Sequence, residues 1–130
     1  MTAGEANAAM GLRVQTIILV NCGRKPLTLT GYPGLRLQGS DGARLKLRID
    51  HGARRITTAV HDPGPTTVTL RPRASARFAL VWRNTDDGSR DPQAGATITV
   101  GSARLTFDSP VDLGTTARLG VTAWEATSTR

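Results

Sequence analysis

The stretch Ser75-Ala-Arg-Phe-Ala-Leu-Val-Trp-Arg83 decides the fold, because large apolar residues recur in it at every second position. A period of two is that of a β-strand with one buried face. The residues on the apolar side are Ala76, Phe78, Leu80 and Trp82. We therefore predict a core strand here, with Trp82 sealing the core.

Short β-type segments separated by turn signals continue in both directions from this strand. We predict them at Leu12–Val20, Leu27–Thr30, Leu35–Gln38, Arg44–Ile49, Ile56–Val60, Thr66–Leu70, Ala96–Val100, Ala103–Phe107 and Ala117–Trp124. Gly39-Ser-Asp-Gly42 has the chemistry of a tight hairpin turn, and the segment from Asp108 to Thr116 is expected to be irregular. The pattern predicts an all-β, antiparallel, immunoglobulin-like β-sandwich of about eight strands with Greek-key topology. A small closed β-barrel is the alternative.

The length of 130 residues is that of one domain. We expect a flexible N-terminal segment at 1–11, a single sandwich domain at 12–125 and a C-terminal tail at 126–130. No apolar run reaches the roughly 18 residues of a membrane helix. The single cysteine excludes an internal disulfide framework and a multi-thiolate zinc site.

The chain carries a net charge of +7, which attracts polyanions at long range. Arg44, Lys46 and Arg48 alternate with apolar residues, so they are predicted to form a basic sheet face that meets an anionic polymer or a protein partner. Nucleic acid is disfavoured, because only five aromatic residues are present to stack on bases (Phe 2, Trp 2, Tyr 1). The oligomeric state is either a monomer or a homodimer that forms through edge strands.

Three side chains could carry chemistry. Cys22 lies beside Arg24 and Lys25, whose charges would favour a nucleophilic thiolate, but a cysteine nucleophile normally needs a histidine partner. His51 and His61 each adjoin an aspartate, yet their spacing matches no metal motif. A semi-buried turn cysteine and histidines that adjoin loop carboxylates by chance are the favoured interpretation, and we expect no metal, no cofactor and no catalytic residue.

Trp124 ends the last predicted strand. Its ring either plugs the core, as expected for Trp82, or lies exposed and anchors a ligand or partner.

Several motifs, read in order, resemble the domain of unknown function 4232 family of actinobacterial secreted proteins and lipoproteins. They are Gly11-Leu-Arg-Val-Gln15, Asn21-Cys-Gly23, Gly31-Tyr-Pro33, Val68-Thr-Leu-Arg-Pro72 with Ser75-Ala76, Val81-Trp-Arg-Asn84, Asp112-Leu-Gly-Thr-Thr116 and Ala123-Trp124. The resemblance implies a β-sandwich exported to the cell envelope, and it implies no activity and no catalytic residue.

This sequence departs from the family pattern at two places. The family usually has Pro-Gly where Pro72-Arg73 stands here, so Arg73 would adopt a positive φ at some cost if the turn is kept. Some members have a second cysteine, whereas Cys22 has no second cysteine to pair with.

The first eleven residues lack the basic and apolar regions of a signal peptide. The protein is therefore cytoplasmic if Met1 is its native start, or exported if a leader has been removed.

The leading functional hypothesis is a non-catalytic binding domain of the cell envelope or exterior. The alternative is a small enzyme or accessory protein of a biosynthetic pathway. That alternative predicts a pocket between the sheets or at the loop end that carries Cys22, His51 or His61.

Overall fold

A computed structural model describes residues 1–9, 11–83, 93–115 and 118–127 of the chain. These residues form strands and loops with no helix, as the alternating pattern predicts. The strands are β1 (Thr2–Ala9), β2 (Leu12–Val20), β3 (Leu27–Thr30), β4 (Leu35–Gln38), β5 (Arg48–His51), β6 (Thr67–Leu70), β7 (Ser75–Arg83), β8 (Gln93–Val100), β9 (Ala103–Gly114), β10 (Arg118–Val121) and β11 (Glu125–Ala126).

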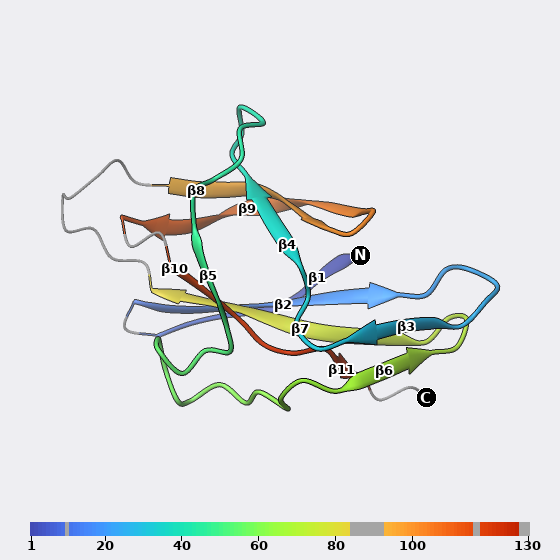
Figure 1. Cartoon of the computed structure of the whole chain (residues 1–130). Helices are drawn as coiled ribbons and strands as arrows, with labels where there is room; N and C mark the ends of the chain where they lie inside the picture. Colours follow the sequence, from blue (N-terminus) through green and yellow to red (C-terminus); the bar gives the residue numbers. More distant parts are fainter. Residues whose placement is uncertain (10, 84–92, 116–117, 128–130) are drawn as a thin grey trace.

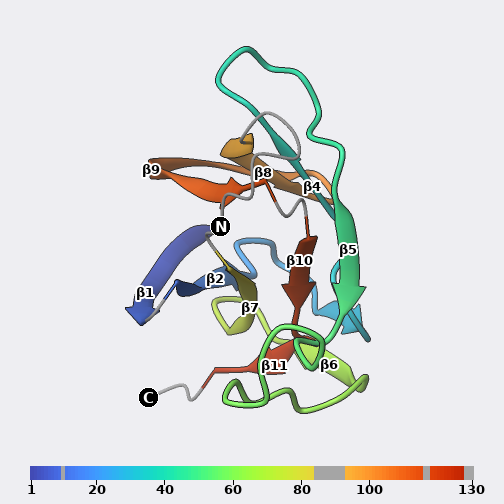
Figure 2. The same ribbon diagram turned by 90° about the vertical axis from the view of Figure 1, so that its left-hand side faces the viewer.

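The largest sheet has the order β1-β2-β7-β10-β5, and β11 also pairs with β7. Strands β4, β8 and β9 form a second sheet, which lies above the first in Figure 1. Strands β3 and β6 form a two-stranded sheet alongside β7 of the largest sheet. Figure 2 shows β1 and β5 on opposite sides of the largest sheet. The arrangement is sandwich-like and antiparallel except for β5 and β10, which run parallel. No closed barrel occurs among the described strands.

Strand β7 has the predicted apolar face. Its inward residues are buried together with side chains from the other two sheets, and Trp82 is 6% exposed. Its partner β2 matches it residue for residue, from Leu12 opposite Arg83 to Val20 opposite Ser75. One core cluster therefore joins all three sheets, because each sheet contributes an apolar face that must be buried against another layer.

The predicted hairpin at Gly39–Gly42 is confirmed. The Gly42 amide donates to the Gly39 carbonyl at 3.0 Å, and the Leu45 amide donates to the Leu37 carbonyl at 2.9 Å. The strand predicted at Arg44–Ile49 is shorter than expected, since only Arg48–His51 forms β5. The segment between the hairpin and β5 leaves the β4 sheet, and β5 then pairs with β10 in the largest sheet.

Three other segments differ from the sequence prediction. Residues 2–9, expected to be a flexible segment, form β1 and supply the outer edge of β2 with backbone partners. The segment at 108–114 continues β9 instead of being irregular, because it pairs with the start of β8 across a register shift. Residues 56–60 form no strand, since the amides of Ile56 and Thr57 both donate to the Ala53 carbonyl in a tight turn.

Glu125–Ala126 forms β11, so the expected C-terminal tail begins within the sheet, and the Thr127 amide donates to the Ser75 carbonyl at 3.0 Å. Residues 128–130 lie outside the described residues. Within the described part of the chain, no helix has the length and apolar character needed to cross a membrane.

Candidate functional site

The loop after β5 folds back over the outer face of the largest sheet. Gly52 continues from β5 in a left-handed conformation, with φ of +96°, and its amide donates to the Val121 carbonyl at 2.7 Å. The loop then passes so close to β10 that a Cβ atom on Gly120 would lie 3.0 Å from the Gly52 carbonyl oxygen. The loop thereby covers Val81 of β7, which is 0% exposed although it lies on the strand face opposite the core cluster.

Tyr32, His51 and Asp62 meet at the end of this loop. The Tyr32 ring stacks on the His51 ring with centroids 4.7 Å apart and planes 9° apart. The Tyr32 hydroxyl donates to Asp62 Oδ2 at 3.0 Å. Asp62 Oδ1 accepts from the backbone amides of Gly64 at 2.9 Å and Ala123 at 3.2 Å. These bonds tie the loop to the segment after β3 and to the segment after β10.

The environment of Tyr32 raises the pKa of its phenol above the ordinary value of 10.0. Desolvation by burial is the largest cause, followed by the hydrogen bond to Asp62 and the negative charge of that carboxylate, while the Arg54 charge acts in the opposite direction. Folding thus favours the neutral phenol, which remains a hydrogen-bond donor.

A cavity of about 630 Å³ opens beside this cluster. It is lined by Tyr32, His51, Gly52, Ala53, Arg54, Thr57, Thr58, Val60, His61, Asp62 and Gly64. The structure therefore brings His51 and His61 to one cavity, although ten positions separate them in the chain. Cys22 does not line this cavity, and its side chain is exposed in the loop after β2.

Among the residues that the structure describes, the two histidines belong to no metal-binding cluster. Across the described ranges, no group of three or more histidine, cysteine, aspartate or glutamate side chains could hold a metal ion. The Asp62 carboxylate already accepts hydrogen bonds from three protein donors.

A second feature is the outer face of the β4-β8-β9 sheet. Arg36 lies opposite Thr99, which lies opposite Arg104 on the next strand. The two arginines are therefore about 10 Å apart along the hydrogen-bonding direction. Arg44 lies beside them through its bridge to Gln38. From here on, the basic sheet face means Arg36, Arg44 and Arg104. A hollow of about 360 Å³ lies between Arg36, Arg44 and Thr99.

The predicted basic residues Arg44, Lys46 and Arg48 are all exposed, and the apolar residues between them are half-buried. They do not share one strand, because Arg48 lies in β5 of the largest sheet. Arg44 instead lines a hollow with Arg36, and Arg104 lies two strands from Arg36 on the same face. Arg36 and Arg104 were not predicted as site residues. Both lie between leucine or alanine neighbours in alternating segments, and that alternation was the signal that could have found them.

Trp124 is 3% exposed and packs edge-to-face against Phe78, with ring centroids 4.9 Å apart. The exposed-ring alternative is wrong for this residue, because the ring forms part of the core. Trp82 is also buried as expected, and its indole Nε1 donates to the Asp112 carbonyl at 2.8 Å.

Tyr32, Arg54 and Asp62 were missed as site residues by sequence reasoning. Glycine and proline in Gly31-Tyr-Pro33 and His61-Asp-Pro-Gly-Pro65 are typical of loops, but which loops meet depends on the strand order of the sheet.

Comparison with protein families gives a match that covers most of the chain. Residues 1–125 match the family described as Domain of unknown function (DUF4232). No curated protein and no solved structure matches the chain. Because the match spans almost the whole sequence and agrees with the motifs quoted above, the chain belongs to the DUF4232 family.

Proposed function

We propose that this chain is a non-catalytic binding domain that holds an anionic polysaccharide on the outer face of the β4-β8-β9 sheet. The observation that carries the proposal is the row Arg36-Thr99-Arg104 with Arg44 beside it. Guanidinium groups bind carboxylate and sulfate oxygens with paired donors, and the Thr99 hydroxyl can donate or accept between them. No ion pair joins any of these three arginines to an acidic side chain of the described residues.

A polysaccharide fits this face better than a single-stranded nucleic acid does. Proteins that hold single strands combine a basic groove with exposed aromatic rings on which bases stack. The aromatic residues Phe78, Trp82, Phe107 and Trp124 are buried, and Tyr32 lies at the loop cavity. The basic sheet face therefore offers charge and hydrogen-bond donors without a stacking platform.

Binding to heparin and to polygalacturonate, measured by isothermal titration at several salt concentrations, tests the proposal. For flexible charged strands, the logarithm of the binding constant falls by about 0.7 per neutralised charge for each tenfold increase in salt. If three charges are neutralised, affinity should therefore fall by roughly 20-fold between about 50 and 200 mM salt. Replacing Arg36, Arg44 and Arg104 together by alanine should abolish most of the binding.

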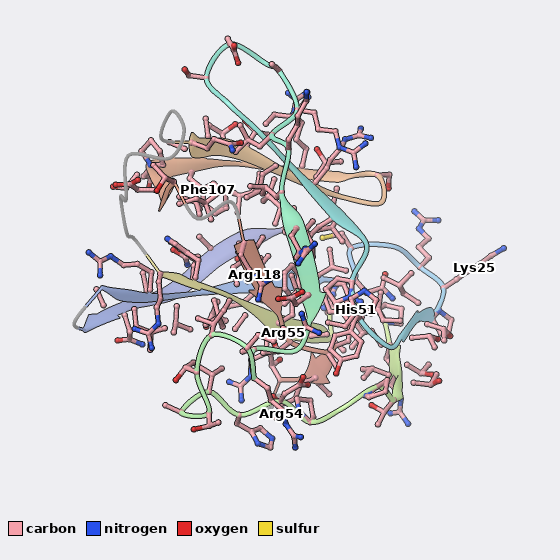
Figure 3. The ribbon with its side chains drawn as sticks, turned by 60° about the vertical axis from the view of Figure 1, so that its left-hand side comes forward. Lys25, His51, Arg54, Arg55, Phe107 and Arg118 are labelled. Carbon is pink, nitrogen blue, oxygen red and sulfur yellow. The ribbon has the colours of Figure 1, made fainter. Side chains whose placement is uncertain are left out.

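A matched variant removes the same charge elsewhere. Arg24, Lys25 and Arg71 are exposed in the loops after β2 and β6, and Figure 3 shows Lys25 projecting away from the molecule. Their joint replacement by alanine should change glycan binding little. Equal losses in the two triple variants would mean that only net charge matters and would refute the proposal, as would tighter binding to single-stranded DNA than to either glycan.

The location that the resemblance implies, the cell envelope or exterior, is a second part of the proposal. It rests on the resemblance of the sequence motifs to a family of secreted proteins and lipoproteins. Fractionation of the source cells with an antibody against this chain should find the protein outside the cytoplasm. Recovery in the cytoplasmic fraction, with Met1 as the native first residue, would refute this part.

Two further possibilities rest on other observations. A homodimer could form through β1 or β5, which lie at the edges of the largest sheet; light scattering after size exclusion should then give twice the monomer mass. The small enzyme or accessory protein is favoured by one observation, the convergence of His51 and His61 on a cavity. It receives no support from Cys22, which does not line that cavity.

A further inference from the structure

We infer that the cavity between β5 and the loop at 52–64 binds a small organic anion through Arg54, His51 and His61. This inference goes beyond the glycan proposal, because it concerns other residues on a different part of the molecule. The ligand class is set by an oxyanion group, phosphate or carboxylate, attached to an organic body.

The hydrogen-bond donors of the cavity suit an anion. Arg54, His51 and His61 line it from three separate chain positions, and their side chains are exposed. Guanidinium and imidazole N–H groups donate hydrogen bonds, and the hydroxyls of Thr57 and Thr58 line the same space. Figure 3 labels His51, at the end of β5, and Arg54, in the loop that follows.

Asp62 is the acidic residue among those that line the cavity, and its carboxylate is already hydrogen-bonded within the protein. Its two oxygens accept hydrogen bonds from the Tyr32 hydroxyl and from the amides of Gly64 and Ala123. The nearby Asp50 carboxylate lies 3.7 Å from Arg118 Nε. The Arg54 guanidinium and the two imidazoles are therefore left to donate hydrogen bonds to a ligand, while the aspartate holds the wall in place.

The wall is built before any ligand arrives. The Tyr32–His51 stack, the Tyr32–Asp62 hydrogen bond and the Asp62–Ala123 hydrogen bond join four segments that are distant in sequence. Gly52 has no Cβ at the point where one would lie 3.2 Å from Asp62 Oδ2. A prearranged wall lowers the entropy cost of binding, which is a property of ligand sites.

The size of the cavity points to an organic ligand. Its volume of about 630 Å³ lies within the range of roughly 300–1,000 Å³ that small-molecule sites occupy. A bare oxyanion would fill only a small part of it. We therefore expect the oxyanion to contact Arg54 and the histidines, and the organic body to occupy the remainder.

Titration calorimetry of the whole chain with glucose 6-phosphate, citrate, inorganic phosphate and glucose tests the inference. We expect glucose 6-phosphate or citrate to bind, and which of them binds identifies the oxyanion as phosphate or carboxylate. Because the chain has two histidines, binding should also shift both imidazole signals in NMR spectra. Failure of both organic anions to bind, or equal binding of glucose, would overturn the inference. Inorganic phosphate binding as tightly as glucose 6-phosphate would overturn the assignment of an organic ligand.

Arg55 supplies the matched control, because it is an exposed arginine next to Arg54 that does not line the cavity. Arg54→Ala should weaken binding of the organic anion at least about tenfold, as expected for loss of a charge-assisted hydrogen bond. Arg55→Ala should change it less than about twofold. Equal effects of the two variants would refute a specific site. Arg54→Ala should leave glycan binding to the basic sheet face unchanged, so the two proposals fail independently.

Discussion

The hydroxyl of Tyr32 donates a 3.0 Å hydrogen bond to Asp62 Oδ2, across a sequence separation of 30 residues. The same carboxylate accepts from the backbone amides of Gly64 and Ala123. One side chain thereby fastens the long loop between β5 and β6 to two other segments. The cavity proposed as an anion site depends on this connection.

Replacing Tyr32 by phenylalanine should lower the free energy of unfolding by about 1 kcal/mol, because the hydrogen bond is lost while the ring remains to stack on His51. Urea unfolding monitored by circular dichroism measures the change. A variant as stable as the wild type would show that the hydrogen bond contributes nothing to the folded state.

The same phenol makes stability depend on alkaline pH. Folding raises the pKa of Tyr32 above 10.0, so the folded state holds its proton more tightly than the unfolded state does. The contribution of this phenol to the stability of the folded state is fully present below pH 10.0 and is lost as the pH rises through the folded-state pKa. Tyr32 is the single tyrosine, so its ionisation can be followed by tyrosinate absorbance. Tyr32→Phe should unfold with a shallower loss of stability above pH 10; identical slopes would contradict this account.

Gly120→Ala should destabilise the protein by about 1–3 kcal/mol, because there is no space for a methyl group between β10 and the loop above it. A Cβ atom there would lie 3.0 Å from the Gly52 carbonyl oxygen and 3.2 Å from Ala53 Cα. Gly34→Ala is the control, since nothing lies within 4 Å of the equivalent Cβ. Thermal unfolding should show a lower Tm for the first variant and little change for the second. Similar shifts in both would mean that the loop can move aside.

Arg73→Gly should stabilise the protein by about 1 kcal/mol, because a non-glycine residue in the left-handed region is strained. Arg73 has φ of 73°, which confirms the expectation that this turn needs a positive φ. Its amide still donates to the Asn21 carbonyl at 2.7 Å, so the turn is retained without the side chain. Arg71→Gly removes the same charge without a positive φ and should give no stabilisation. Equal changes in chemical denaturation of the two variants would assign the effect to charge.

Asn21→Ala should cost about 2–4 kcal/mol, because one buried amide side chain satisfies three backbone groups. Asn21 Nδ2 donates to the carbonyls of Lys25 and Leu70, each at 2.9 Å, and Oδ1 accepts from the Gly23 amide at 3.0 Å. The neighbouring Cys22→Ser is the comparison, since that side chain is exposed and should tolerate the change. Equilibrium unfolding of both variants tests the difference, and a neutral Asn21→Ala would show that water replaces these bonds.

The local sequence pattern was enough to predict those elements that depend only on neighbouring residues. The alternation in Ser75–Arg83 predicted its buried face, and Gly39–Gly42 predicted its hairpin, because both depend on neighbouring residues alone. Strand β1 could not be predicted in this way. Its residues are mostly small and show no alternation, and it is a strand because the edge of β2 offers it hydrogen-bond partners.

What the sequence by itself determined was the all-β class, the core face of β7, the exposure of the basic residues near Arg44 and the family motifs. The tertiary structure alone decided that β5 leaves the β4 sheet to run parallel to β10, and that Tyr32, His51 and Asp62 meet. The physical reason is that side-chain alternation is a property of one strand, whereas the meeting of loops depends on which strands exchange hydrogen bonds across long separations.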